Sequence, residues 1–134
     1  MKIFLDTNVL ASAIATRGLC ADLFQVVLAE HELVVGIYVL EELQDVLARK
    51  FHLPTQAIKE YLALLRDEGD VITTSVLPQT TLRDGDDEKV LSNALAGKAD
   101  VFVTGDNELL ALKSLQGMPI VSPRGLWSLL QKSV

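Results

Sequence analysis

The chain alternates short apolar runs with longer segments of helical spacing, and this alternation is the strongest constraint on its fold. The runs that we expect to be strands are Lys2–Leu5, Leu33–Val35, Val71–Val76, Val101–Val103 and Pro119–Val121. The expected helices are Asn8–Ala15, Ala21–Glu30, Tyr38–Lys50, Thr55–Glu68, Glu88–Ala96, Glu108–Leu115 and Pro123–Gln131, with a loop at Leu77–Asp86. Strands that alternate with helices predict an α/β fold, in which helices cover both faces of a parallel sheet.

Length and composition predict one compact domain over residues 1–134. The hydrophobic residues make up 49% of the 134 residues, which excludes global disorder. The net charge of −6 argues against binding to nucleic acid through a broad basic surface, although it allows an enzyme whose acidic residues hold cations. Cys20 is the only cysteine, and no apolar run approaches the roughly 18 residues of a membrane span. We therefore expect a cytoplasmic protein.

Two aspartates stand at or shortly after the ends of predicted strands. Asp6 follows the first strand, and Asp106 stands three residues after the fourth strand in the run Thr104-Gly105-Asp106-Asn107. In an open α/β sheet, ligands bind beyond the carboxyl ends of the strands, so both carboxylates could face one crevice. Each aspartate taken alone is also a good helix N-cap, and that interpretation stays open.

The helix Tyr38–Lys50 supplies a third candidate acid. At about 100° per residue, Glu42 lies at the border of the apolar stripe of this helix. Glu41 and Asp45 lie on the solvent side. Glu42 is therefore the acid best placed to look into a crevice, although an ordinary boundary glutamate would show the same pattern.

An acidic run, Asp84-Gly85-Asp86-Asp87-Glu88, precedes the fifth predicted helix. Acids at a helix start are usually favoured by the helix dipole. Extrapolated back from the apolar stripe, however, Asp87 falls within about 20° of its centre. A carboxylate on the apolar face of a helix loses solvation free energy unless a positive charge compensates it.

Asp6, Glu42, Asp87 and Asp106 thus form a candidate cluster of four carboxylates. Such groups would repel one another, and Mg²⁺ or Mn²⁺ would remove the repulsion because these hard ions prefer oxygen ligands. His31, His52 and Cys20 have no zinc-type spacing, and no glycine-rich phosphate loop or nucleophile elbow occurs. The residues therefore favour a magnesium or manganese site.

Four motifs in order resemble the PIN-domain family. They are Leu5-Asp6-Thr7-Asn8-Val9-Leu10, Leu40-Glu41-Glu42-Leu43, Arg83-Asp84 with Asp87, and Val103-Thr104-Gly105-Asp106. The sequence is most similar to a prokaryotic branch of toxin–antitoxin components, and the resemblance extends over the whole domain. It implies a five-stranded parallel sheet in the order 3-2-1-4-5. It also implies Mg²⁺- or Mn²⁺-dependent cleavage of RNA, with a cognate antitoxin protein as partner.

The resemblance also assigns roles. Asp6 and Asp106 would be the main metal ligands, and Glu42 and Asp87 would complete the catalytic site or orient water. The third acid could be Asp87 or Glu88, and the helical phase favours Asp87. The auxiliary residues would be Asp84, as an acid behind the metal ligands or a helix cap, and Asn8 and Thr104. The last two could form hydrogen bonds to carboxylates or a phosphate, unless they only cap helices. Basic candidates for the rim of the crevice are Arg17, Arg49, Lys50, Arg83 and Lys89.

Two alternatives remain beside a ribonuclease. A receiver-type signalling domain would need an acidic pair near the first strand end and a Lys after the last strand, and the chain has Asp6-Thr7-Asn8 and Ser122-Pro123 there. The other alternative is a PIN fold that binds nucleic acid or protein without catalysis. We also expect a homodimer, because the helices that contain Leu62 and Trp127 carry more apolar residues than one buried stripe needs.

Overall fold

The computed structural model describes residues 1–76 and 85–132. The strands are β1 (Lys2–Leu5), β2 (Glu32–Gly36), β3 (Asp70–Ile72), β4 (Val101–Val103), β5 (Ser114–Leu115) and β6 (Met118–Val121). The helices are α1 (Thr7–Ala15), α2 (Leu19–Glu30), α3 (Ile37–Arg49), α4 (Thr55–Glu68), α5 (Gly85–Ala96), α6 (Asn107–Leu110) and α7 (Pro123–Lys132). The predicted α/β class is confirmed.

The sheet has the order β3-β2-β1-β4-β6-β5. Five of these strands run parallel in the expected 3-2-1-4-5 arrangement, because β6 is the strand predicted at Pro119–Val121. The expected count of five strands was wrong for the described residues. The two-residue strand β5 adds a sixth, antiparallel to β6 at the sheet edge.

The additional strand stands where a longer helix was expected. The helix predicted at Glu108–Leu115 ends at Leu110, and Lys113 takes a left-handed backbone conformation with φ 62°. A left-handed residue stops a helix, since the chain turns away from the helical path. Gln116 and Gly117 also have positive φ angles, and they close the turn between β5 and β6.

Two other elements differ in length from the prediction. The third strand ends at Ile72 instead of Val76, although its residues are rich in β-branched side chains. Helix α5 begins at Gly85, three residues before the predicted start, so the acidic run from Asp86 to Glu88 forms its first turn. Most of the predicted loop Leu77–Asp86 lies outside the described residues.

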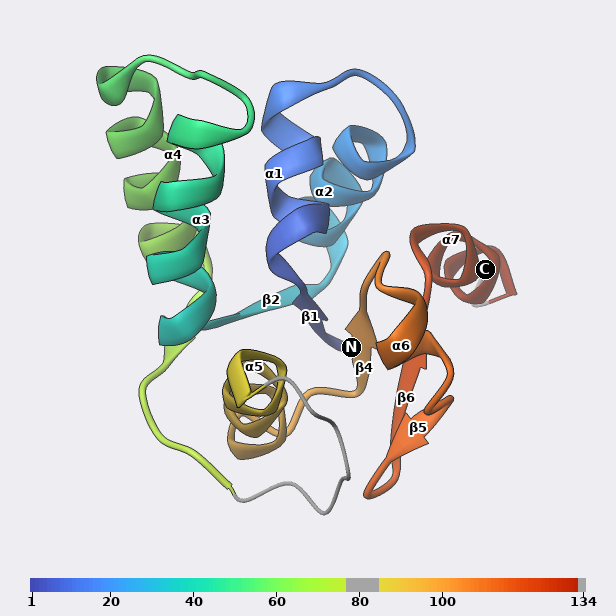
Figure 1. Ribbon diagram of the computed structural model, residues 1–134. Helices are drawn as coiled ribbons and strands as arrows, with labels where there is room; N and C mark the ends of the chain where they lie inside the picture. The colour runs from blue at the N-terminus through green and yellow to red at the C-terminus, as the bar shows by residue number, and fades with distance from the viewer. Residues whose placement is uncertain (77–84, 133–134) are drawn as a thin grey trace.

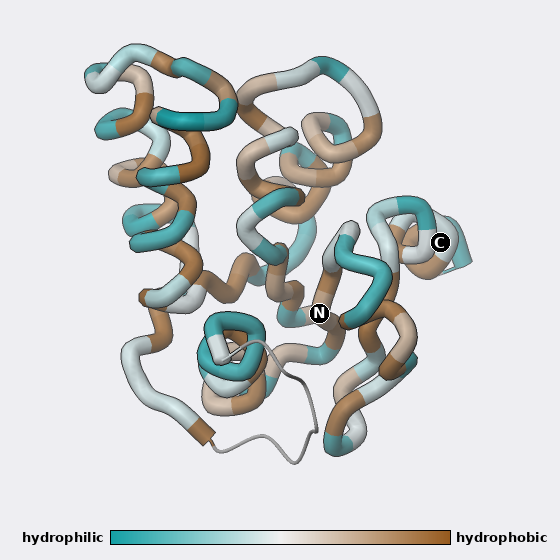
Figure 2. Tube along the Cα trace, in the orientation of Figure 1, coloured by the Kyte–Doolittle hydropathy of each residue, from teal (hydrophilic) through white to brown (hydrophobic). Residues whose placement is uncertain are grey.

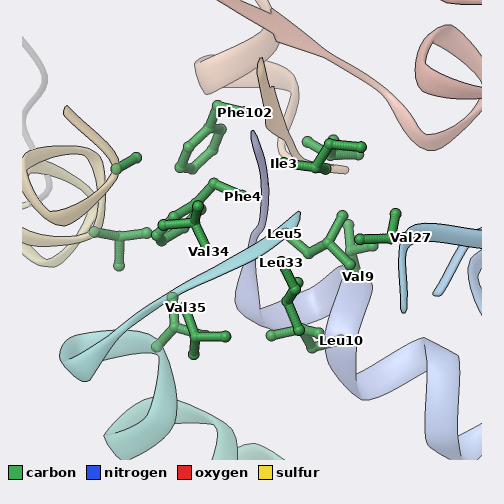
Figure 3. Close-up of a cluster of buried hydrophobic side chains, with 14 of the residues drawn as sticks. Ile3, Phe4, Leu5, Val9, Leu10, Val27, Leu33, Val34, Val35 and Phe102 are labelled. Carbon is green, nitrogen blue, oxygen red and sulfur yellow. The ribbon is translucent and has the colours of Figure 1, made fainter. Parts of the chain in front are cut away.

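Helices α1 to α4 lie on one side of the sheet and α5 lies on the other (Figure 1). Successive residues of β1 point to opposite faces, so each face receives its own part of the core. Phe4, Val34 and Phe102 lie toward α5, whereas Leu5 and Leu33 lie toward α1 (Figure 3). The rings of Phe4 and Phe102 are stacked, with their centroids 5.1 Å apart. The central strands are accordingly the most continuously hydrophobic part of the chain (Figure 2).

In the part of the chain that the structure describes, no single helix is long and apolar enough to cross a membrane. Helices α1 and α2 together meet the length and composition, but they meet at a 103° bend. Leu10, Leu23 and Val27 of this pair are fully buried in the core.

Candidate active site

Asp6 is a buried carboxylate at the carboxyl end of β1. Its backbone N–H donates to the carbonyl oxygen of Val103 at 2.9 Å, so the end of β1 is tied to the end of β4. One carboxylate oxygen accepts from the backbone N–H of Thr7 at 2.8 Å, which makes Asp6 the N-cap of α1. The other oxygen accepts from the hydroxyl of Thr104 at 2.7 Å. The capping interpretation is therefore correct, and the same carboxylate also faces the neighbouring strand end.

Asp106 is attached to the same threonine. Its backbone N–H donates to Oγ1 of Thr104 at 3.0 Å, so this one hydroxyl contacts both aspartates. The Asp106 carboxylate caps α6 by accepting from the backbone N–H of Glu108 at 2.8 Å. Thr104 is fully buried, and Asp106 is half-buried. The predicted role of Thr104 as a hydrogen-bond donor to a carboxylate is thus visible.

Glu42 joins this group from α3. Its carboxylate accepts a hydrogen bond from the hydroxyl of Thr7, the residue that follows Asp6. The Glu42 side chain is otherwise exposed, as expected for a residue at the border of the apolar stripe. Thr7 was not singled out from the sequence, and only its place directly after a strand-end aspartate could have indicated its role.

Burial raises the pKa of the Asp6 carboxyl above its ordinary value, because the charged form loses solvation. The hydrogen bonds from Thr104 and Thr7 act in the opposite direction. The negative charges of Glu42 and Asp106 act in the same direction as burial and raise the pKa further. Shared hydrogen-bond partners thus connect Asp6 with Glu42 through Thr7, and Asp6 with Asp106 through Thr104.

The remaining acidic candidates belong to α5 or to the segment before it. Asp87 and Glu88 are both half-buried in the first turn of α5, and Asp86 is exposed. Since burial does not separate Asp87 from Glu88, the choice between them stays a prediction. Asn8 is exposed in the first turn of α1. Asp84 lies outside the described residues.

The donor set suits a hard divalent cation better than a softer metal. Among residues 1–76 and 85–132, no group of three His, Cys, Asp or Glu side chains forms a ready metal cage. Mg²⁺ does not need one, since it is usually bound through one or two carboxylates and keeps several waters. The raised pKa of Asp6 beside two further carboxylates is the electrostatic situation that a divalent cation relieves.

A family model described as PIN domain matches residues 2–108. The chain belongs to the PIN-domain family. The matched range contains Asp6, Glu42, Asp87 and Asp106. Membership supports a hydrolase of the nuclease type, and PIN-domain nucleases generally use divalent metal ions.

Two solved structures show the same PIN-domain fold. One is VapBC2 from Rickettsia felis bound to a DNA fragment from its promoter, with a TM-score of 0.67 at 15% identity. That match covers 91% of this chain and 98% of the other. The second is VapBC-1 from nontypeable Haemophilus influenzae, with a TM-score of 0.65, 16% identity, and coverage of 92% and 99%. A search of curated proteins found no match.

A cleft between α3 and α5 adjoins the acids of this PIN domain. It has a volume of about 330 Å³, and Glu42 forms part of its wall. Asn93, which is fully buried in α5, fixes the distance between the two helices. Its side-chain oxygen accepts from the backbone N–H of Tyr38 at 3.3 Å, and its amide nitrogen donates to the carbonyl of Thr74 at 2.8 Å.

Asn93 was also missed from the sequence. It stands next to Ser92 among the apolar positions of α5, and this polar pair within an apolar run is the signal that could have indicated it. Gly36 belongs to the same contact, since a Cβ there would lie 2.7 Å from the side-chain oxygen of Asn93. A side chain at position 36 would therefore force the start of α3 away from α5.

Proposed function

We propose that this PIN-domain protein is a Mg²⁺- or Mn²⁺-dependent endoribonuclease and the toxin of a toxin–antitoxin pair. The observation that carries the proposal is that Asp6 and Asp106, just beyond the ends of β1 and β4, share hydrogen-bond partners with each other and with Glu42 of α3. The family supports the nuclease class, and the likeness to VapBC structures supports a toxin with an antitoxin partner. The proposal places the protein in the cytoplasm.

Asp6 and Asp106 would hold the ion, with Glu42 and Asp87 completing the site or orienting water. A bound divalent ion would supply charge stabilisation at the scissile phosphate and would lower the pKa of a coordinated water. Thr104 fixes the orientation of the Asp6 carboxylate and the backbone of Asp106 by its two hydrogen bonds. Thr7 positions the Glu42 carboxylate in the same way.

The remaining residues have supporting roles in this proposal. Glu88 is the alternative to Asp87, and both stand in the first turn of α5 beside Asp86, which lines the cleft. Asn8 is exposed next to the site and could donate to a phosphate of the substrate. Asp84 is proposed as an auxiliary acid on the strength of the motif alone.

The decisive experiment is incubation of the protein with single-stranded and hairpin RNAs, in Mn²⁺ and in EDTA, with mass spectrometry to locate the cuts. We expect internal cuts that require the ion. Asp6→Asn should lower the rate by roughly 10²-fold or more, the scale for losing one group that stabilises the transition state.

Asp22→Asn is the matched control, because Asp22 is an exposed aspartate in the first turn of α2. It should cleave like the wild type. Equal cleavage by wild type and Asp6→Asn, or cleavage that persists in EDTA, would refute the proposal. Absence of cleavage with retained RNA binding would favour the non-catalytic PIN module.

We also propose a homodimer, although the structure leaves fewer apolar side chains exposed for it than the sequence predicted. Most of the apolar stripe of α4 is buried within the single chain, including Tyr61 and Leu62. Leu64 and Trp127 remain exposed, at 38% and 37%. Sedimentation at micromolar protein tests the assembly, and a mass of 14.6 kDa would reject the dimer.

A further inference from the structure

The cleft between α3 and α5 has a composition that the catalytic acids do not explain. It is lined by Tyr38, Glu41, Glu42, Asp86, Lys89 and Val90. Each helix presents residues at positions i, i+3 and i+4, so the lining side chains lie on one face of each helix. Val90 is buried, and Tyr38 is half-buried. The cleft therefore combines an apolar and aromatic surface with a rim of charges.

The aromatic ring of Tyr38 lies next to a cation. The Lys89 ammonium is 5.7 Å from the centroid of the ring, and it is 4.0 Å from a carboxylate oxygen of Asp86. Lys89 is exposed, so its ammonium can exchange the ring for a stronger partner such as a phosphate.

The charges that line the cleft favour the base of a nucleotide over its phosphate. Three carboxylates and one ammonium line the cleft, which disfavours a phosphate inside it. A neutral, planar base suffers no such repulsion, and stacking on an aromatic ring is how unpaired bases are commonly bound.

Glu41 gives the cleft an acceptor for a base edge. Among the described residues, Glu41 has no hydrogen-bond or ion-pair partner, whereas Glu42 accepts from Thr7 and Asp86 lies near Lys89. A carboxylate accepts hydrogen bonds only. Guanine offers two adjacent donors, N1–H and the 2-amino group, on its Watson–Crick edge, so it matches a carboxylate better than the other three bases do.

We propose that this cleft is a subsite for one unpaired base of the substrate RNA, with a preference for guanine. The base stacks on Tyr38, its donors face Glu41, and Lys89 contacts the phosphate that carries it. The inference rests on the proposed ribonuclease function and adds the substrate class: RNA with an unpaired guanine near the cut.

The floor of the subsite is preorganised. Asn93 accepts from the backbone N–H of Tyr38, and Gly36 lets the first turn of α3 approach Asn93 closely. The backbone of Tyr38 is therefore fixed before a base arrives, and a preformed floor lowers the entropic cost of binding. Glu42 belongs both to this cleft and to the acid cluster, so a bound base would place the adjoining phosphodiester near the acids.

The test measures the binding of fluorescent single-stranded RNA oligonucleotides to Asp6→Asn protein in millimolar Ca²⁺. One oligonucleotide contains A, C and U only, and the other has a single central G. Adding Tyr38→Leu should weaken binding of the G-containing RNA by roughly 5- to 100-fold, the range for losing one base–aromatic stack. Tyr38→Phe should restore it, and Trp127→Leu, which removes an exposed aromatic residue of α7, should have no effect.

Two further variants separate the contacts. Glu41→Gln should reduce the preference for G over the G-free RNA by roughly tenfold. Lys89→Gln should weaken the binding of both RNAs alike, and it should lower the salt dependence of binding by an amount that corresponds to about one phosphate contact. Circular dichroism of each variant checks that the fold is intact, so that a loss of binding is assigned to the cleft.

The outcomes separate this inference from the proposed function. RNA cleavage by the Tyr38→Leu protein with unchanged binding and unchanged sites would overturn the subsite and leave the ribonuclease standing. Binding that depends on Tyr38 and on G, without cleavage by any form containing Asp6, would support the subsite and refute the ribonuclease. Absence of binding to either RNA would overturn the subsite.

Discussion

The site has two sides that are built in different ways. On the β1/β4 side, Asp6 and Asp106 follow adjacent strands, and one threonine hydroxyl contacts both. On the α3/α5 side, Glu42 and Tyr38 stand on a helix whose distance from α5 depends on Asn93. Strands in the middle of a sheet are fixed by hydrogen bonds to both neighbours, whereas the two helices are joined by side chains. The strand side is therefore fixed by the sheet itself, whereas the helix side, which carries Glu42 and the proposed base subsite, depends on the contact that Asn93 makes.

The first prediction, with the largest expected effect, tests whether Asn93 holds α3 against α5. Asn93→Ala would leave the backbone N–H of Tyr38 and the carbonyl of Thr74 without their present partner, and it would open a small cavity. We expect a loss of about 2–4 kcal/mol in the free energy of unfolding, measured by urea denaturation.

Ser92→Ala is the control for Asn93→Ala. Ser92 is also buried in α5, but its hydroxyl donates only to the carbonyl of Lys89 in the same helix. Its removal should cost no more than about 1 kcal/mol. Equal losses for the two variants would mean that Asn93 has no special part in joining α3 to α5.

The second prediction concerns the strand side. If the acids around Asp6 hold a divalent ion, Mn²⁺ should raise the melting temperature of the wild type. At a free ion concentration of 100 times Kd the gain is about 2.7 kcal/mol. Asp106→Asn should reduce this gain, and Asp22→Asn should keep it. Millimolar Mn²⁺ without any shift for the wild type would contradict the metal site.

The two sides also differ in how far the sequence could predict them. Asp6 and Asp106 could be found because each follows a buried strand, and strand ends of a parallel sheet meet at one edge. Glu42 could be found from the phase of its helix. The sequence could at most mark Thr7 and Asn93 as unusual, because their partners are 35 and 55 positions away along the chain.

The fold shows the same division. The strand order follows from the alternation of strands and helices and from the family resemblance. The end of α6 does not follow, because Glu108–Leu115 has helical spacing, and the left-handed turn at Lys113 is imposed by pairing of β5 with β6. Local pattern predicts the kind of element, and tertiary pairing decides where it stops.

The third prediction tests the threonine that joins the two aspartates. Thr104→Val keeps the size and shape of the side chain but removes the hydroxyl that contacts Asp6 and the backbone of Asp106. Loss of a residue that orients a metal ligand typically costs 10- to 100-fold in activity or metal affinity, so we expect roughly that loss in RNA cleavage. Thr104→Ser should recover most of it. A Thr104→Val enzyme as active as the wild type would show that the strand side needs no such orientation.

The fourth prediction has the smallest expected effect, a gain in stability for Asp6→Asn. Burial raises the pKa of Asp6 in the folded chain above its value in the unfolded chain. At pH values between these two pKa values, the folded chain therefore binds more protons than the unfolded chain. Stability therefore falls as the pH rises through that window, and the full cost is present above the folded pKa. Asn carries no charge, so Asp6→Asn should gain stability relative to the wild type at neutral pH in metal-free buffer.

This gain should vanish below the ordinary pKa of an aspartate, where Asp6 is protonated in both the folded and the unfolded chain. Thermal melts of both proteins at the two pH values measure how the stability difference between them changes as Asp6 gains or loses its charge. A stability difference that does not change with pH would show that burial of the charged Asp6 carboxylate has no cost in stability.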